Sequence, residues 1–301
     1  MKNAQFGKTF SCYVIGDDSL LTQCSQILLD KGQDVLGVIT SDPKIELWAK
    51  EKKLPCFEND LTLIEKLRSK PFDYLFSIAN LKILPAEILS LPRKGAINFH
   101  DGPLPEYAGL NATSWAIING EKFHGITWHF ITDEIDKGDI LCRQTFEVAE
   151  DETAFTLNTK CFEEAFKSFG KLVDDLIDNS TIRIKQEFQN RSYFGKHKKP
   201  SNACVISWQE SAESISALVR GLNFERYSNP LGSAKIKIND EFYIVKNSAV
   251  VEVKEVHQPG IILGYDEKTM TIAAKADAVK LYNFESLDGK EVSIKDIIDK
   301  F

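Results

Sequence analysis

The stretch "INFHDGPLPEYAGLNATSW", residues 97–115, begins as an apolar strand and then changes its character abruptly. Asn98 and His100 are two residues apart in the apolar run of residues 95–100. Alternate side chains of a strand point to the same face, so this amide and this imidazole are expected side by side. A Gly-Pro-x-Pro turn follows almost at once and ends the predicted strand.

The segments around this strand alternate between strand and helix patterns. Apolar runs predict strands and helical spacing predicts helices, the strands over residues 11–16, 34–40, 72–79, 95–100 and 124–132 and the helices over 19–32, 43–54 and 85–91. Strands that alternate with helices are joined by right-handed crossovers into a mostly parallel sheet. The predicted fold class is therefore α/β, with a Rossmann-like sheet covered by helices on both faces.

The pattern changes after a long amphipathic helix predicted over residues 151–180. Residues 185–203 are polar and contain Gly195 and Pro200, and we interpret them as a linker. Beyond them, short alternating runs at regular spacing predict a smaller β-barrel of the OB type. The predicted division of the chain is a catalytic domain over residues 1–184, the linker over 185–203 and a barrel-like domain over 204–301.

Composition and charge exclude several classes of protein. The net charge is −7, and residues 191–301 hold 16 basic against 15 acidic residues, which argues against a nucleic-acid partner. The six cysteines are scattered singly and no His/Cys cluster has zinc-like spacing, so no metal is expected. No leader and no apolar run of membrane-spanning length is found, so we expect a cytoplasmic protein with no membrane partner.

An acidic loop follows the strand predicted over residues 124–132. It reads "DEIDKGDIL" and offers several carboxylates beside Gly138. If its strand neighbours the strand of Asn98 and His100, an amide, an imidazole and a carboxylate meet at one rim. An amide N–H and a protonated imidazole can both stabilise the oxyanion that forms when a carbonyl is attacked. A carboxylate can orient the imidazole and relay a proton from an attacking amine.

The residues alone leave two interpretations open. Short motifs such as Asn-x-His are often structural, and an acidic loop with glycine is often an ordinary solvated turn. His129, which belongs to the next strand, is expected to be a core or supporting histidine rather than a catalytic one. Composition and spacing therefore do not decide between a carbonyl-attack site and a structural strand end.

The motifs "NFHDGPLP" and "TDEIDKGDIL" resemble those of the folate-dependent formyltransferase family. The resemblance covers essentially the whole chain and includes the C-terminal barrel domain of the methionyl-tRNA and sugar N-formyltransferases. It implies that Asn98, His100 and Asp136 are the catalytic residues, with Asp136 rather than Asp133 as the carboxylate. Gly102 and Pro103 depart from the family pattern, which has a serine in this turn.

The resemblance also implies 10-formyltetrahydrofolate as the co-substrate. In the family, backbone groups of two loops hold its pterin, and the matching residues here are Ile83 and Leu84 in the loop of residues 79–89 and Thr132, Asp133, Glu134 and Ile135 in the acidic loop. Leu84 taken alone also fits an ordinary core leucine.

The acceptor is expected to be a primary amine. The segment "PEYAGLNATSW" most resembles formylation domains of nonribosomal peptide or hybrid synthetases, which implies a small or carrier-bound amine and fusion to, or partnership with, a synthetase. The residues expected to line the acceptor pocket are Tyr107, Gly109, Asn111 and Trp115. The alternatives are an amino-sugar nucleotide, methionyl-tRNA, or water as acceptor. Outside the enzyme class, the chain could be an inactive docking module that binds folate or a nucleotide.

Overall fold

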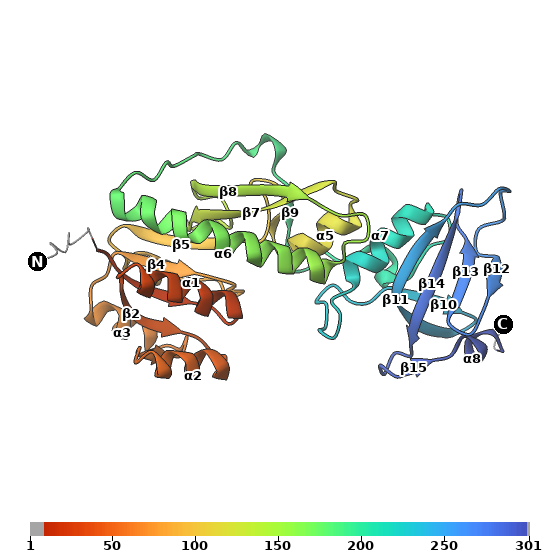
Figure 1. Ribbon diagram of the computed structural model, residues 1–301, viewed down its shortest axis with the longest axis horizontal. Helices are drawn as coiled ribbons and strands as arrows, with labels where there is room; N and C mark the ends of the chain where they lie inside the picture. Colours follow the sequence, from red (N-terminus) through yellow and green to blue (C-terminus); the bar gives the residue numbers. More distant parts are fainter. Residues whose placement is uncertain (1–8, 300–301) are drawn as a thin grey trace, which may run out of the picture. The chain divides into compact units, whose positions relative to one another are not determined.

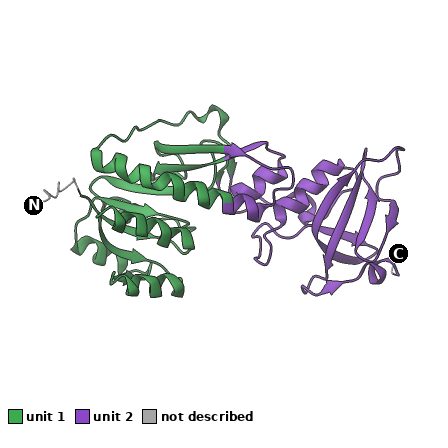
Figure 2. Cartoon of the chain, viewed as in Figure 1, with its two compact units in different colours: residues 1–108, 125–145, 160–193 green, residues 109–124, 146–159, 194–301 purple. Residues whose placement is uncertain are grey.

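The computed structural model describes residues 9–299, which form two compact units (Figure 2). The first unit takes the chain up to Ala108 and then adds Gly125–Thr145 and Lys160–Tyr193. The second unit consists of Gly109–His124, Phe146–Thr159 and the chain from Phe194 onward. Each unit is thus built from several passes of the chain. The predicted domain boundaries at residues 184 and 204 remain a prediction.

The first unit is built on a seven-stranded sheet with the strand order β3-β2-β1-β4-β5-β7-β8 (Figure 1). The pairs from β3 to β5 are parallel, and β7 runs antiparallel to β5. The strands are β1 (Ser11–Ile15), β2 (Asp34–Ile39), β3 (Cys56–Phe57), β4 (Tyr74–Ser77), β5 (Gly95–His100), β7 (Phe123–Phe130) and β8 (Ile140–Glu147). This arrangement confirms the predicted Rossmann-like, mostly parallel sheet.

Helices cover both faces of this sheet because neighbouring strand residues point in opposite directions. Leu75 belongs to a core cluster that includes residues of α3 and α4, whereas the ring of Phe76 contacts Phe169 of α6 on the other face. The helices of this unit are α1 (Ser19–Asp30), α2 (Pro43–Glu51), α3 (Leu63–Ser69), α4 (Ala86–Leu89) and most of α6 (Ala154–Asp178), whereas α5 (Ala112–Ile118) belongs to the second unit. Helices therefore pack against the sheet on both of its faces.

The second unit carries a curled antiparallel sheet, a half-barrel that confirms the predicted barrel-like C-terminal domain. Asn239 and Asp240 form a hairpin turn between residues 238 and 241, and Asn239 has a φ of 51°. The strands are β10 (Lys235–Ile238), β11 (Glu241–Val251), β12 (Ile262–Tyr265), β13 (Thr269–Ala273), β14 (Ala278–Glu285) and β15 (Glu291–Val292), with helices α7 (Ala212–Leu222) and α8 (Ile294–Ile298).

The segment predicted as a linker contains short ordered elements. These are the 3₁₀ turns η1 (Phe188–Asn190) and η2 (Ser201–Cys204), and between them β9 (Tyr193–Phe194), which pairs with β6 (Ala108–Gly109). All six cysteines are free thiols. Within residues 9–299, no helix combines the length and the apolar character needed to cross a membrane.

Candidate active site

The register of three neighbouring strands sets a row of polar side chains across the sheet. Asn98 of β5 stands opposite Ser77 of β4 on one side and opposite His129 of β7 on the other. Residues that face each other in register point to the same side of a sheet. The backbone pairing therefore brings a hydroxyl, an amide and an imidazole together where β4 and β5 end.

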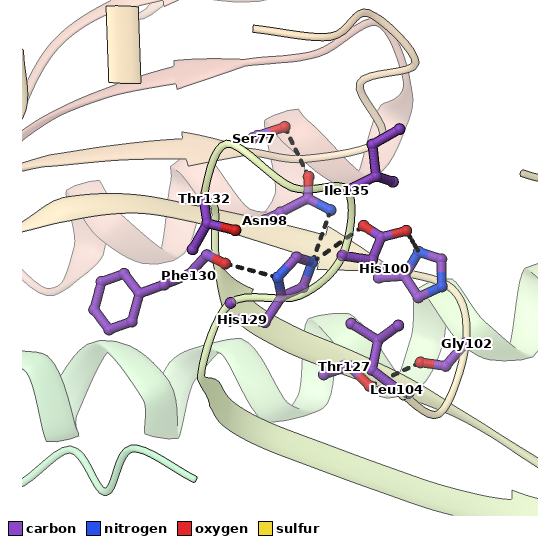
Figure 3. Close-up of polar contacts among 12 residues, drawn as sticks. Ser77, Asn98, His100, Gly102, Leu104, Thr127, His129, Phe130, Thr132 and Ile135 are labelled. Carbon is purple, nitrogen blue, oxygen red and sulfur yellow. Dashed lines mark hydrogen bonds and ion pairs between the residues drawn. The ribbon is translucent and has the colours of Figure 1, made fainter. Parts of the chain in front are cut away.

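Hydrogen bonds fix the orientation of the Asn98 amide (Figure 3). The Ser77 hydroxyl donates to Asn98 Oδ1 at 2.8 Å, and Asn98 Nδ2 donates to His129 Nε2 at 3.3 Å. His129 Nδ1 lies 2.8 Å from the carbonyl of Phe130, which can only accept, so Nδ1 carries the ring proton. The second N–H of Asn98 has no acceptor among residues 9–299 and remains available to a bound group.

His129 is held as a neutral ring. Its side chain is buried, and this burial lowers its pKa to about 4, with Asp136 and the Phe130 carbonyl opposing the effect and His100 adding to it. At neutral pH the lone pair on Nε2 is therefore free to accept from Asn98. This agrees with the expectation that His129 supports the site rather than reacting in it.

Asp136 belongs to the loop between β7 and β8, and its carboxylate lies near the rings of His100 and His129. Its Oδ2 lies 3.9 Å from His100 Nδ1, and its Oδ1 lies 3.6 Å from His129 Nε2. The backbone of Asp136 has a φ of 54°, in the left-handed region that few residues other than glycine adopt. Gly138 is required for the same loop, because a Cβ there would lie 1.8 Å from the carbonyl oxygen of Phe130.

His100 is buried, and its two ring nitrogens have different surroundings. Nε2 donates to the carbonyl oxygen of Tyr107 at 2.8 Å. Nδ1 lies 3.9 Å from a carboxylate oxygen of Asp101 and 3.9 Å from one of Asp136, which is too far for a direct hydrogen bond to either. Nδ1 is therefore the nitrogen that can serve a third partner.

Gly102 explains one departure from the family pattern. A Cβ at this position would lie 2.8 Å from His100 Nε2 and 3.0 Å from the Tyr107 carbonyl oxygen. The turn is held by Thr127, whose hydroxyl donates to the Gly102 carbonyl at 2.7 Å and accepts from Leu104 N at 3.0 Å (Figure 3). The glycine thus leaves room for the bond that orients His100.

The predicted folate-binding residues lie on two loops of the first unit. Leu84 is 7% exposed and packs in the core, so only its backbone can serve a ligand, whereas the Ile83 side chain is 81% exposed. Thr132 accepts from Glu134 N, and Asp133, Glu134 and Ile135 are exposed. Ile83 and Ile135 thus present apolar surface, whereas Asp133 and Glu134 carry exposed carboxylates.

The predicted acceptor residues divide between the units. Tyr107 is buried in the first unit and contributes its carbonyl to His100. Gly109, Asn111 and Trp115 belong to the second unit, where the Trp115 ring stacks on Phe194 with a centroid distance of 5.0 Å. Asn111 has a φ of 58° and its side chain makes no capping bond, so backbone geometry accounts for an asparagine there. An acceptor role for these residues remains a prediction.

Two contributors escaped the sequence analysis. Ser77 ends an apolar strand without any motif, and only the pairing of β4 with β5 reveals its contact with Asn98. The Tyr107 carbonyl is a backbone group, so the sequence offers no signal for it. In the part of the chain that the structure describes, no group of His, Cys, Asp or Glu side chains is arranged to hold a metal ion.

An amide, an imidazole and a carboxylate arranged at a strand end fit the chemistry of attack on a carbonyl group, and the comparisons with known proteins identify the class of enzyme. Residues 28–171 match the family described as "Formyl transferase", and residues 199–301 match "Formyl transferase, C-terminal domain". The methionyl-tRNA formyltransferase of Agathobacter rectalis is 30% identical over 76% of this chain and 71% of its own length. That of Clostridium tetani is 29% identical over 80% and 75%.

A solved structure has the same fold. The N-formyltransferase of Helicobacter canadensis, in complex with folinic acid and dTDP-3-aminofucose, gives a TM-score of 0.68 at 18% identity, over 90% of this chain and 98% of its own. The chain therefore belongs to the formyltransferase family and is a formyl-transferring enzyme. The family uses 10-formyltetrahydrofolate as its formyl donor.

Proposed function

We propose that this enzyme transfers the formyl group of 10-formyltetrahydrofolate to the primary amine of a small or carrier-bound acceptor, an amino acid in a synthetase pathway. The observation that carries the proposal is the meeting of Asn98, His100 and Asp136 at the end of β5, with His100 Nδ1 and Asp136 Oδ2 3.9 Å apart. The folate supplies the formyl carbon, and the amine of the acceptor attacks it directly. No Ser or Cys nucleophile is needed.

Asn98 stabilises the negative charge that develops on the formyl oxygen. Ser77 and His129 hold its amide in place, and its second Nδ2 hydrogen donates to that oxygen. Because the donor is oriented before the reaction, it lowers the barrier without any cost of rearrangement; one such donor contributes about 3 kcal/mol.

His100 acts through Nδ1, since Nε2 is bonded to the Tyr107 carbonyl. In its protonated form, Nδ1 donates to the formyl oxygen and supplies the proton that the leaving folate nitrogen takes up. Asp136 lies on the same side of the ring and accepts the proton that the attacking amine gives up. One proton thus leaves the amine and one reaches the leaving nitrogen, so the reaction is balanced without a metal.

The donor is held by the two loops beside the cluster. Backbone groups of Ile83, Leu84 and residues 132–135 bind the pterin. Exposed aliphatic side chains on the same loops give an apolar surface for its rings: Leu81 is 84% exposed, Ile83 81% and Ile135 45%. Large aliphatic side chains left in solvent beside a polar cluster fit a flat aromatic ligand, which supports this assignment.

The choice of acceptor rests on sequence and charge. The segment "PEYAGLNATSW" resembles formylation domains of peptide synthetases, and Tyr107, Gly109, Asn111 and Trp115 are proposed to serve the acceptor side. The near balance of charge in residues 191–301 is unfavourable for holding tRNA. Two other acceptors have support from relatives: methionyl-tRNA from the Agathobacter rectalis enzyme and an amino-sugar nucleotide from the Helicobacter canadensis enzyme.

A panel of amines tests the proposal. The enzyme is incubated with 10-formyltetrahydrofolate and free amino acids, carrier-loaded aminoacyl groups, an amino-sugar nucleotide or methionyl-tRNA, and mass spectrometry detects the gain of one carbonyl group. We expect transfer to an amino acid or its carrier-bound form, abolished by His100→Ala and unchanged by His197→Ala, which alters an exposed histidine. Formate release at full rate without an amine identifies a hydrolase, and folate binding without turnover identifies a docking module; either result contradicts the proposal.

A further inference from the structure

The acidic loop that carries Asp136 has contacts within itself, between Thr132 and Glu134 and between Glu134 and Lys137, and it is also bound from outside. Asp136 has a φ of 54°, and the neighbouring Asp133, Glu134 and Ile135 are exposed. A residue in the left-handed region costs of order 1 kcal/mol or more and persists only where surrounding contacts fix it. The side chains outside the loop that bind its backbone carbonyl groups include Gln186 and Arg191, in the segment after α6.

Gln186 binds two carbonyl groups of the loop. Its Nε2 donates to the Asp136 carbonyl at 2.9 Å and to the Gly138 carbonyl at 2.7 Å. Carbonyl oxygens only accept, so the side chain must present its NH₂ group to the loop. Its Oε1 is buried without a hydrogen-bond partner among the described residues, a cost that the two carbonyl contacts offset.

Arg191 extends the same contact by one residue. Its Nη2 donates to the Ile135 carbonyl at 3.0 Å, and its guanidinium lies 5.1 Å from the centre of the Tyr193 ring. Together, Gln186 and Arg191 bind three carbonyl groups of a four-residue stretch, residues 135–138. The Asp136 carbonyl and carbonyl groups before and after it in the chain thus accept hydrogen bonds from this segment.

Ser192 binds the backbone of the segment that follows His100, at Tyr107 and Ala108. Its Oγ accepts from Tyr107 N at 2.8 Å, and its carbonyl accepts from Ala108 N at 3.0 Å. The carbonyl of the same Tyr107 accepts the Nε2 proton of His100. The backbone of the His100 turn and that of the Asp136 loop are therefore both bound by residues 186–192.

The segment is itself anchored to the first unit. Ile184 and Ile140 exchange backbone hydrogen bonds of 2.8 and 2.9 Å, which attach it to the start of β8. The Phe188 ring lies 5.5 Å from the Lys137 ammonium group, inside the acidic loop. An anchored segment can set the position of two loops, whereas a free linker cannot.

We propose that Gln186, Arg191 and Ser192 form a brace that sets the distance between Asp136 and His100, so that these three side chains are positioning residues for formyl transfer. The inference rests on the catalytic roles proposed above for Asp136 and His100. The proposal gives a positioning role to residues 186–192, whose polarity alone indicates a linker. Misplacing a catalytic group by about 1 Å can lower a rate about 100-fold.

The test compares Gln186→Ala and the isosteric Gln186→Glu with Gln189→Ala, which alters an exposed glutamine of the same segment. For Gln186→Ala we expect kcat to fall roughly 10- to 100-fold while KM for the amine changes less than about threefold, with Gln189→Ala like wild type. Arg191→Lys is expected to retain more activity than Arg191→Ala, because one donor to Ile135 survives. Equal activity of Gln186→Ala and Gln189→Ala overturns the proposal.

A double variant separates positioning from general destabilisation. If Gln186 acts through Asp136, Gln186→Ala in an Asp136→Asn background lowers the residual rate less than about twofold. A purely structural role would lower the rate equally in both backgrounds, and that result contradicts the brace. If Asp136→Asn alone is as active as wild type, the proposed function fails instead.

Hydrogen exchange gives a readout that requires no substrate. We expect the backbone amides of residues 133–139 to exchange at least about tenfold faster in Gln186→Ala than in Gln189→Ala, while the amides of β1 and β4 are unchanged. Unchanged exchange in the loop contradicts the brace whatever the acceptor proves to be.

Discussion

Two polar regions, one in each unit, use similar residue types in different ways. In the second unit, a groove of about 460 Å³ is lined by residues of α7, β11 and β14 and by the loop between α7 and β10. Its Lys246 pairs with Glu285 at 3.2 Å, and the Asn223 amide bonds to backbone groups at both ends. In the first unit, the Asn98 amide keeps one N–H available, and His100 Nδ1 lies 3.9 Å from two carboxylates.

The difference shows how polar groups that stabilise a fold differ from those arranged for chemistry. In the groove, the Asn223 amide is bonded to backbone groups and Lys246 is paired with Glu285, so a variant of either residue removes a local contact. In the strand-end cluster, side chains orient Asn98 and a backbone carbonyl orients His100, and both keep a nitrogen available to a bound group. Variants of the two regions should therefore differ in what they change, and this contrast gives the predictions that follow.

Among the variants that contrast the two regions, the largest effect is expected for Asp136→Asn. The amide keeps the shape of the side chain but cannot accept the proton of the amine, so kcat should fall about 10²- to 10⁴-fold. Steady-state formylation of the acceptor found in the panel measures this loss. Activity within a factor of two of wild type would mean that Asp136, like the groove residues, takes no part in the chemistry.

The next effect concerns stability and pH. Burial holds the folded-state pKa of His129 at about 4, below its ordinary value of 6.5. As the pH falls from 6.5 toward 4, the unfolded chain takes up the proton first, so the free energy of unfolding decreases by about 3 kcal/mol; above 6.5 this contribution is constant. Urea unfolding of wild type and His129→Asn at pH 7 and pH 4.5 measures it. Equal pH dependence of the two proteins contradicts a neutral His129.

Ser77→Ala should have an intermediate effect on activity. The variant leaves Asn98 Oδ1 without its 2.8 Å donor, so the amide is oriented by His129 alone. We expect kcat to fall roughly tenfold, with the free energy of unfolding lower by about 1 kcal/mol. Ser69→Ala, at an exposed hydroxyl at the end of α3, is the control. An unchanged kcat would mean that Asn98 needs no support from β4.

The smallest effect is expected in the groove of the second unit. Lys246→Met breaks a half-exposed ion pair with Glu285 and should change kcat for a small amine less than about twofold. The same assay as for Asp136→Asn measures it. A tenfold loss would show that this groove takes part in turnover and would remove the contrast between the two regions.

The sequence predicts the fold well because the fold follows from local patterns. Apolar runs and helical spacing are properties of neighbouring residues, and they place β1, β2, β4 and β5 close to where the structure has them. Asn98, His100 and Asp136 are candidate catalytic residues from the sequence alone because they lie in recognisable motifs. The need for Gly102 is visible only when the His100 ring is present, since nothing in the local sequence reveals it.

Contacts between distant segments account for what the sequence does not predict. Ser77 meets Asn98 through strand register, and Gln186 meets Asp136 across 50 positions of chain. Neither residue interrupts a periodic pattern, so polarity alone makes Gln186 look like part of a linker. The contact of Trp115 with Phe194 is likewise between distant segments: its ring is 6% exposed and stacked on Phe194, and its predicted acceptor role remains a prediction.

The most direct measurement is the single-turnover rate of formyl transfer by Asn98→Ala, with 10-formyltetrahydrofolate binding measured on the same protein. An oriented amide donor at the reacting oxygen predicts a rate about 10²- to 10³-fold below wild type, with donor affinity changed less than about threefold. A transfer rate within twofold of wild type would contradict the claim that the cluster at the end of β5 carries out the reaction.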